Sequence, residues 1–253
     1  MAGEVALARR LVAEAGGTAF LSAAVAGSAT MAERLAHGYP ALALVTSAVA
    51  GGCALLAITL AFGNISGGYF NPASTLRAAC TRDLSWRDAV LYAVVQTLGA
   101  LVGVAASGFV LGDPSSFPGR LGLTDLQLRR IEFIAIFGFV ALDACCRRTR
   151  RDAVAYALAG YLVAATWAFG TPSLANPAVS IAAAAIDPPA RVAIAALVSL
   201  LAAQLGGALA SALVMAWLLS SPVRNAATGV MPREPVRRSD SETVQLARLA
   251  TVE

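Results

Sequence analysis

The chain has 253 residues, of which 58% are apolar and only 13% are charged. A soluble domain of this length would carry about a quarter charged residues, so the composition argues against a water-soluble protein and indicates a chain surrounded largely by lipid. The formal net charge of +4 does not require a nucleic-acid partner, because the basic residues follow the predicted membrane topology.

Six segments are long and apolar enough to cross a bilayer, which takes about 20 residues of helix. In chain order they are approximately 7–32, 40–62, 87–111, 128–146, 153–170 and 191–220. Two shorter apolar stretches, 71–80 and 176–186, are about half a span long at ~1.5 Å per residue. We predict an all-α membrane protein with six transmembrane helices and two re-entrant half-helices.

Arginine placement predicts the orientation. Six spans put both termini on one side of the membrane, and most of the 19 basic residues, all of them arginine, fall on that side. The densest group lies at 147–151, between the fourth and fifth spans. The positive-inside rule makes this side the cytoplasm. The Ala-rich, Lys-free composition is typical of a bacterium, so we expect a multi-pass protein of the bacterial inner membrane. The polar residues 223–253 would form a disordered cytoplasmic tail.

An internal repeat divides the chain. The tripeptide Asn-Pro-Ala at 71–73 recurs at 176–178, and Gln96 in the third span recurs as Gln204 in the sixth. We predict a first repeat at 1–115 and a second at 116–222. Three spans per repeat is an odd number, so the second repeat is inverted relative to the first. Inverted repeats place a permeation site near the membrane midplane.

The two tripeptides suit the start of a half-helix. Asn is a good helix N-cap, Pro fits the first helical position and Ala favours helix. Two half-helices that meet end to end would each bring a partial charge of roughly +0.5 to the pore centre, which opposes cations, while the Asn amides donate to a passing oxygen. The predicted pore motifs are Asn71, Pro72, Ala73, Asn176, Pro177 and Ala178.

These motifs carry a family resemblance. The segment Gly-Asn-Ile-Ser-Gly-Gly-Tyr-Phe-Asn-Pro-Ala at 63–73 resembles the first signature of the major intrinsic protein family, the aquaporins and aquaglyceroporins. Ser-Leu-Ala-Asn-Pro-Ala at 173–178 resembles the second. The resemblance covers about residues 7–220. It implies an aquaporin-like fold with one pore per subunit, assembled as a homotetramer.

Glu14 in the first span recurs as Glu132 in the fourth. A carboxylate within a membrane is a functional candidate, which leaves a proton-coupled secondary transporter as an alternative. We favour a structural role, because irregular backbone before each half-helix needs hydrogen-bond acceptors at membrane depth, and the family resemblance implies the same. A membrane-structural protein with a closed pore is a third possibility.

The selectivity filter departs from the family. The family's outer constriction usually has Arg three residues after the second Asn, where this chain has Val179. Spacing from the motifs puts the other filter positions at Gly51, Ala164 and Ser173. Such a constriction is wide and neutral, so we expect passage of uncharged solutes larger than water. The residues around Val179 also resemble an arsenic-resistance-associated bacterial subgroup, which implies arsenous acid or other metalloid hydroxides. Glycerol, urea and ammonia remain open.

Enzymatic chemistry is not expected. The single histidine, His37, lies in a predicted outer loop, and no nucleophile–base pair is evident. The four cysteines show neither disulfide nor metal spacing, so we expect no cofactor and no metal. The expected partners are water, small neutral solutes and membrane lipid, with no nucleic acid.

Overall fold

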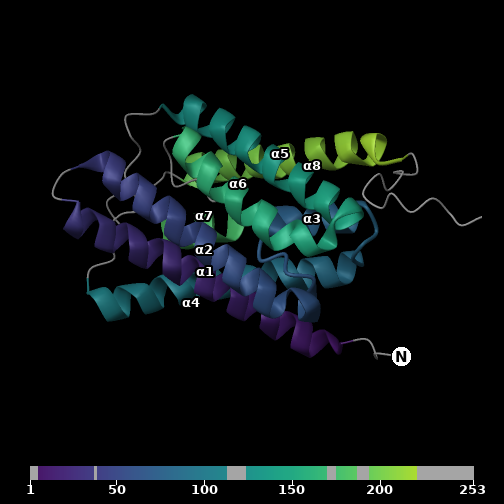
Figure 1. Ribbon diagram of the computed structural model, residues 1–253, viewed down its shortest axis with the longest axis horizontal. Helices are drawn as coiled ribbons and strands as arrows, with labels where there is room; N and C mark the ends of the chain where they lie inside the picture. The colour runs from purple at the N-terminus through teal and green to yellow at the C-terminus, as the bar shows by residue number, and fades with distance from the viewer. Residues whose placement is uncertain (1–4, 37–38, 113–123, 170–174, 187–193, 221–253) are drawn as a thin grey trace, which may run out of the picture. The chain divides into compact units, whose positions relative to one another are not determined.

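The computed structural model describes residues 5–36, 39–112, 124–169, 175–186 and 194–220. All regular elements in these residues are helical (Figure 1). They are α1 (Leu7–Leu35), α2 (Pro40–Ser66), α3 (Pro72–Cys80), α4 (Trp86–Leu111), α5 (Asp125–Thr149), the short 3-10 helix η1 (Arg151–Ala153), α6 (Val154–Phe169), α7 (Pro177–Ile186) and α8 (Ile194–Leu218). The six long helices coincide with the predicted spans to within a turn, which confirms the predicted fold class.

Five of the long helices have the length and apolarity of a membrane span. The sixth, α5, is 25 residues long but carries charges toward both ends: Asp125, Arg129, Arg130, Glu132, Asp143, Arg147 and Arg148. Its longest uncharged stretch is residues 133–142, and the charged residues on either side lower the average hydropathy of the helix. Glu132 and Asp143 are buried, at 4% and 0% exposure. These two carboxylates in the interior of α5 therefore face protein, as expected at membrane depth, whereas Asp125 in the first turn is exposed.

The long helices form two groups, and each half-helix contacts helices of both groups. Helix α1 packs against α2 and α4, and α5 packs against α6 and α8. The contact between α2 and α6 joins the groups. The half-helix α3 contacts α4, α5 and α8, while α7 contacts α4 and α8. Figure 1 shows both half-helices enclosed by the longer ones.

Glycines allow the closest helix crossings. A Cβ added at Gly99 of α4 would collide with the carbonyl oxygen of Ala15 on α1. A Cβ added at Gly207 of α8 would lie 2.5 Å from the carbonyl oxygen of Phe133 on α5. Small residues let two backbones approach in this way, which is the usual means of packing helices within a membrane.

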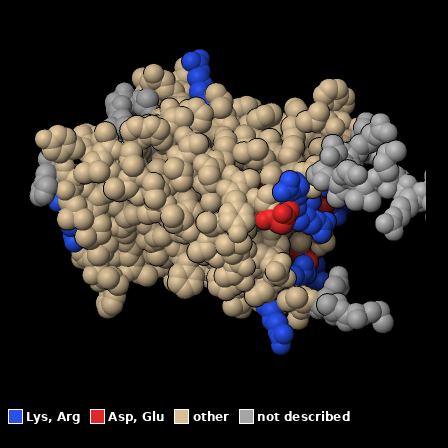
Figure 2. Space-filling view, viewed as in Figure 1, with Lys and Arg blue, Asp and Glu red and all other residues tan. Residues whose placement is uncertain are grey.

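Exposed aromatic residues mark two levels along the bundle. At one end, where α4 and α6 begin and α8 ends, the large exposed side chains include Trp86, Tyr156 and Trp217. At the other end they include Tyr39, Phe109 and Trp167. Aromatic residues concentrate at the two membrane–water interfaces. Figure 2 shows a nearly uncharged band between the ends, with the charged side chains gathered mainly at one of them. Both features indicate a membrane-spanning bundle.

Backbone contacts group residues 1–221 into one unit and residues 222–253 into another. The predicted cytoplasmic tail at 223–253 lies outside the described residues, so its disorder stays a prediction. The repeat boundaries at 115 and 222 also stay predictions.

Candidate functional site: the meeting of two half-helices

Asn71 and Asn176 lie at the N-termini of α3 and α7, where the two half-helices meet. The side-chain amide of Asn71 donates to the carbonyl oxygen of Ala175 at 2.8 Å. The amide of Asn176 donates to the carbonyl oxygen of Phe70 at 2.9 Å. Each asparagine thus binds the residue that immediately precedes the other. These two reciprocal bonds fix the ends of the half-helices against each other inside the bundle.

The same asparagines cap their own helices. Asn71 Oδ1 accepts from the backbone N–H of Ala73 at 2.8 Å, and Asn176 Oδ1 accepts from that of Ala178 at 3.1 Å. Pro72 and Pro177 begin the half-helices, where the missing N–H costs nothing. Each tripeptide is therefore a helix start whose cap also reaches across to the opposite half-helix.

The residues just before the asparagines have an unusual backbone. Phe70 has φ of 49° and Ala175 has φ of 44°, values in the left-handed region that non-glycine residues seldom occupy. Such a conformation costs on the order of 1 kcal/mol. The left-handed conformation occurs at the residue just before each Asn-Pro-Ala tripeptide. Each of these two residues also presents its carbonyl oxygen to the opposite asparagine, so the strain accompanies the contact that joins α3 to α7.

Glu14 supports the turn that leads into α3. The side chain is fully buried. One carboxylate oxygen accepts from the Ser66 hydroxyl at 2.6 Å and from the Tyr69 N–H at 3.0 Å. The other accepts from the Phe70 N–H at 2.7 Å and from the Gln96 amide at 2.8 Å. The carboxylate thus supplies acceptors for backbone N–H groups that have no water to bond at this depth.

Glu132 stands in a similar relation to α7. Its carboxylate accepts from the Gln204 amide at 2.9 Å, and Gln204 also donates to Ser180 on α7 at 2.9 Å. On the other side of the bundle, Gln96 donates both to Glu14 and to Thr75 on α3, the latter at 2.9 Å. Each glutamate–glutamine pair therefore ties a half-helix to two long helices.

The structure describes three of the four positions that the sequence predicts for the filter. Val179 lies in the first turn of α7 and is only 2% exposed. Gly51 is buried on α2, Ala164 is exposed on α6, and Ser173 lies outside the described residues. A Cβ added at Gly52 would collide with the side chain of Val163. Gly52 and Val163 are the chain neighbours of Gly51 and Ala164. Gly51 and Ala164 therefore lie at about the same height along the contact between α2 and α6.

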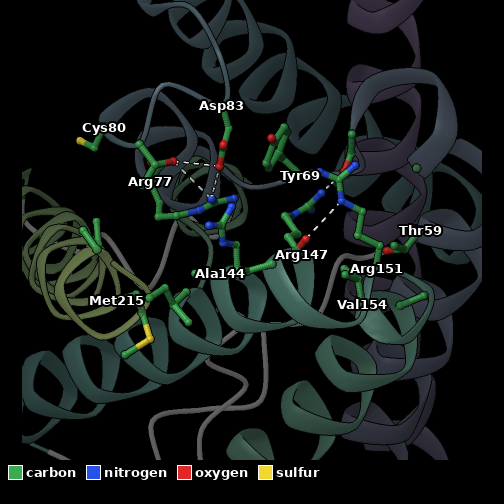
Figure 3. Close-up of a pocket in the computed structure, with 18 of the residues that line it drawn as sticks. Thr59, Tyr69, Arg77, Cys80, Asp83, Ala144, Arg147, Arg151, Val154 and Met215 are labelled. Carbon is green, nitrogen blue, oxygen red and sulfur yellow. Dashed lines mark hydrogen bonds and ion pairs between the residues drawn. The ribbon is translucent and has the colours of Figure 1, made fainter. Parts of the chain in front are cut away.

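An ion-pair network near α3 was not anticipated from the sequence. Asp143 of α5 accepts from Arg147 at 2.6 Å and from Arg77 of α3 at 3.0 Å. Arg147 also donates to the carbonyl oxygen of Gly67 at 2.7 Å, and its guanidinium lies 4.5 Å from the ring centre of Tyr69 (Figure 3). Sequence reasoning used Arg147 only to orient the chain. The feature of the sequence that could have indicated this network is Asp143, an aspartate within an apolar span and four residues before Arg147.

This network borders a cavity of about 1050 Å³, whose lining includes Thr59, Gly67, Tyr69, Arg77, Arg147 and Val154. We refer to it as the arginine cavity. It lies among the end of α2, the turn after it, the C-terminal part of α3, and the ends of α5 and α8 (Figure 3). Gly67 and Tyr69 precede Asn71 by four and two residues. The arginine cavity therefore reaches the turn that leads to the meeting point of the half-helices.

Two half-helices joined by capping asparagines inside a six-helix membrane bundle define a channel of the aquaporin class. A family model for "Major intrinsic protein" matches residues 1–142. "Aquaglyceroporin AqpS" of Rhizobium meliloti is 36% identical over 216 residues, which cover 85% of this chain and 92% of that protein. The chain belongs to the major intrinsic protein family.

Other relatives match shorter stretches. "Aquaporin NIP1-1" of Oryza sativa is 34% identical over 142 residues, which cover 54% of this chain and 48% of the relative. "Aquaporin-4" of Mus musculus is 35% identical over 109 residues, covering 40% and 33%. The X-ray structure of the aquaglyceroporin from Plasmodium falciparum superposes with a TM-score of 0.65 at 15% identity, over 82% of this chain and 95% of that one, and shows the fold. The protein is thus a passive membrane channel for water and small solutes, not an enzyme.

Proposed function

We propose that this channel passes water and uncharged solutes of glycerol-like size through a wide constriction without arginine. The observation that carries the proposal is Val179. It follows Asn176 by three residues, in the first turn of α7, at the position where the family usually has an arginine. Pore diameter, lining donors and charge decide what a narrow pore admits. A valine there removes a bulky cation and leaves room for a larger neutral molecule.

The proposed constriction is formed by Gly51, Ala164, Ser173 and Val179. Each side chain is small, and none is charged at neutral pH. At the pore centre, Asn71 and Asn176 each use one amide hydrogen in the reciprocal bonds described above. An asparagine amide has two donors, so a second hydrogen on each is available to a passing hydroxyl oxygen. The half-helix N-termini add partial positive charge that opposes cations.

For the solute, we propose glycerol-like molecules, including neutral metalloid hydroxides such as arsenous acid. Arsenous acid is uncharged at pH 7 and comparable to glycerol in shape, so a wide neutral constriction suits both. The relative from Rhizobium meliloti is named an aquaglyceroporin, and it matches over most of both chains.

A proton-coupled transporter would need a carboxylate that exchanges protons during transport. Glu14 is fully buried, and four donors occupy its two oxygens. This arrangement favours a support role for Glu14, and we propose the same for Glu132. Uptake that equilibrates a solute without any response to a proton gradient would separate the channel from the transporter.

We further propose a homotetramer in the bacterial inner membrane with both termini in the cytoplasm. The supporting observation for this orientation is the arginine-rich segment at the end of the bundle that holds the arginine cavity. The inverted repeats would extend over 1–115 and 116–222, followed by the tail at 223–253.

Replacing Val179 by arginine tests the constriction. In proteoliposomes we expect glycerol permeability to fall by about tenfold or more, equivalent to a barrier roughly 1.4 kcal/mol higher, while water permeability falls much less. Val179→Met is the matched control, because it lengthens the side chain without adding charge. Light scattering after a hyperosmotic glycerol jump measures both permeabilities. Unchanged glycerol entry in the arginine variant would contradict the placement of the constriction at Val179.

A further inference from the structure

We propose that Arg147 is a specificity-determining residue that excludes cations where the arginine cavity meets the pore. This inference rests on the proposed channel function and on the proposed absence of arginine at the outer constriction. Arg147 would act at the end of the permeation path opposite to that outer constriction. The first reason is position: Arg147 lines the arginine cavity together with Gly67 and Tyr69 of the turn that leads to Asn71.

The second reason is the use of backbone acceptors. Arg147 donates to the carbonyl oxygens of Gly67 at 2.7 Å and Gly68 at 3.4 Å. A cation that enters a narrow pore sheds water and needs oxygen ligands in its place, which backbone carbonyls supply in cation-selective channels. Here the Arg147 guanidinium already donates to both of these carbonyl oxygens. The same group that repels an entering cation thus also removes its replacement ligands.

The third reason is that the guanidinium is fixed in place. Asp143, which is fully buried, accepts from Arg147 at 2.6 Å, and the Tyr69 ring lies against the guanidinium at 4.5 Å. About a fifth of the Arg147 side chain remains exposed. Three different partners therefore hold the charge at one position while part of it faces open space. Asp143 acts here as a positioning residue.

The charges around Arg147 leave the lining of the arginine cavity with a net positive charge. Asp143 is shared between Arg147 and Arg77, and Arg77 also pairs with Asp83. These four side chains are balanced among themselves. The arginine cavity is also lined by Arg148, Arg151 and Asp152, which add one net positive charge. The lining as a whole is positive, and within it Arg147 is the arginine that binds the turn next to Asn71.

Among the residues that the structure describes around α7, no arginine takes the place that Arg147 has beside α3. Val179 occupies its first turn, and Ala182, Ala26 and Val104 form an apolar cluster beside it. The two ends of the path therefore differ. The described residues place a fixed guanidinium beside the turn before α3, whereas the buried cluster packed beside α7 is apolar.

The test is the electrical conductance of proteoliposomes containing full-length Arg147→Gln, recorded in a potassium chloride gradient so that the reversal potential identifies the permeant ion. We expect potassium conductance to rise at least about tenfold over wild type, with glycerol flux within about twofold of wild type, and Arg147→Lys to restore exclusion. The matched control is Arg148→Gln, which lines the same cavity without a bond to the turn and should leave conductance low. A purely structural role for Arg147 would lower glycerol flux without a potassium leak.

Arg147→His gives a second test that does not depend on how well Arg147→Gln folds, because one and the same protein is compared in its charged and neutral states. The imidazole is charged at acid pH and neutral above about pH 6.5, so a potassium leak should appear as the pH is raised and disappear when it is lowered. Wild type over the same pH range is the reference. Normal glycerol flux without a potassium leak in the neutral state, or a leak selective for chloride, would overturn the inference. Absence of glycerol flux in the wild type would overturn the proposed function itself.

Discussion

Replacing Glu14 by leucine is expected to abolish both water and glycerol flux and to lower the thermal stability of the protein sharply. The substitution leaves the N–H groups of Tyr69 and Phe70, the Ser66 hydroxyl and the Gln96 amide without their acceptor. A buried donor without a partner costs about 1–3 kcal/mol, and four such losses approach the whole stability of a typical protein, roughly 5–15 kcal/mol. The turn before α3 would no longer hold Asn71 in place.

The measurement is the melting temperature of the purified protein in detergent, followed by flux in proteoliposomes. Glu33→Leu is the control, because Glu33 lies on the same helix and is exposed. Glu14→Gln should be intermediate, since an amide keeps one acceptor oxygen. A Glu14→Leu protein with wild-type melting temperature and flux would show that α1 does not support the half-helix.

Gly99→Ala is expected to separate α1 from α4 and to destabilise the bundle strongly. The new methyl group would collide with the carbonyl oxygen of Ala15. That oxygen belongs to the backbone of a helix, so the collision cannot be relieved by a side-chain rotation. Overpacking of this kind costs about 1–3 kcal/mol or more. Gln96, one turn earlier on α4, holds Glu14, so a shift of α4 would also disturb the pore centre.

Gly16→Ala is the matched control for this prediction, because a Cβ at Gly16 has no heavy atom within 4 Å. It should leave the protein unchanged or slightly more stable, since alanine favours helix. Melting temperature and glycerol flux of the two variants, measured side by side, decide the matter. Equal stability of both variants would contradict the close crossing of α1 and α4.

Much of the fold could be predicted from sequence because the signals are local. Runs of apolar residues gave the six long helices, and the two Asn-Pro-Ala tripeptides marked the starts of α3 and α7. Among the long described helices, α5 is the one that does not reach the apolarity of a membrane span, because it carries charged residues in its first and last turns. The repeated spacing identified both half-helices without any structural information.

The pore surroundings were less predictable. The reciprocal bonds of Asn71 and Asn176 join residues more than a hundred positions apart. The pair Arg77–Asp143 joins α3 to α5. No local pattern reveals such contacts, since they depend on how the helices pack. The place of Val179 could be predicted because it lies three residues after Asn176 in the chain. The expected place of Ala164 depends on the segment that connects α6 to Asn176, and residues 170–174 of that segment lie outside the described residues.

The most direct test of the central claim is the volume response of proteoliposomes to hyperosmotic glycerol. A channel that admits water and a larger neutral solute predicts rapid shrinking followed by rapid re-swelling, both faster than in protein-free liposomes. Rapid shrinking without re-swelling would contradict the wide constriction and leave a water-selective pore. No acceleration of either phase, with correctly folded protein, would contradict an open channel of any kind.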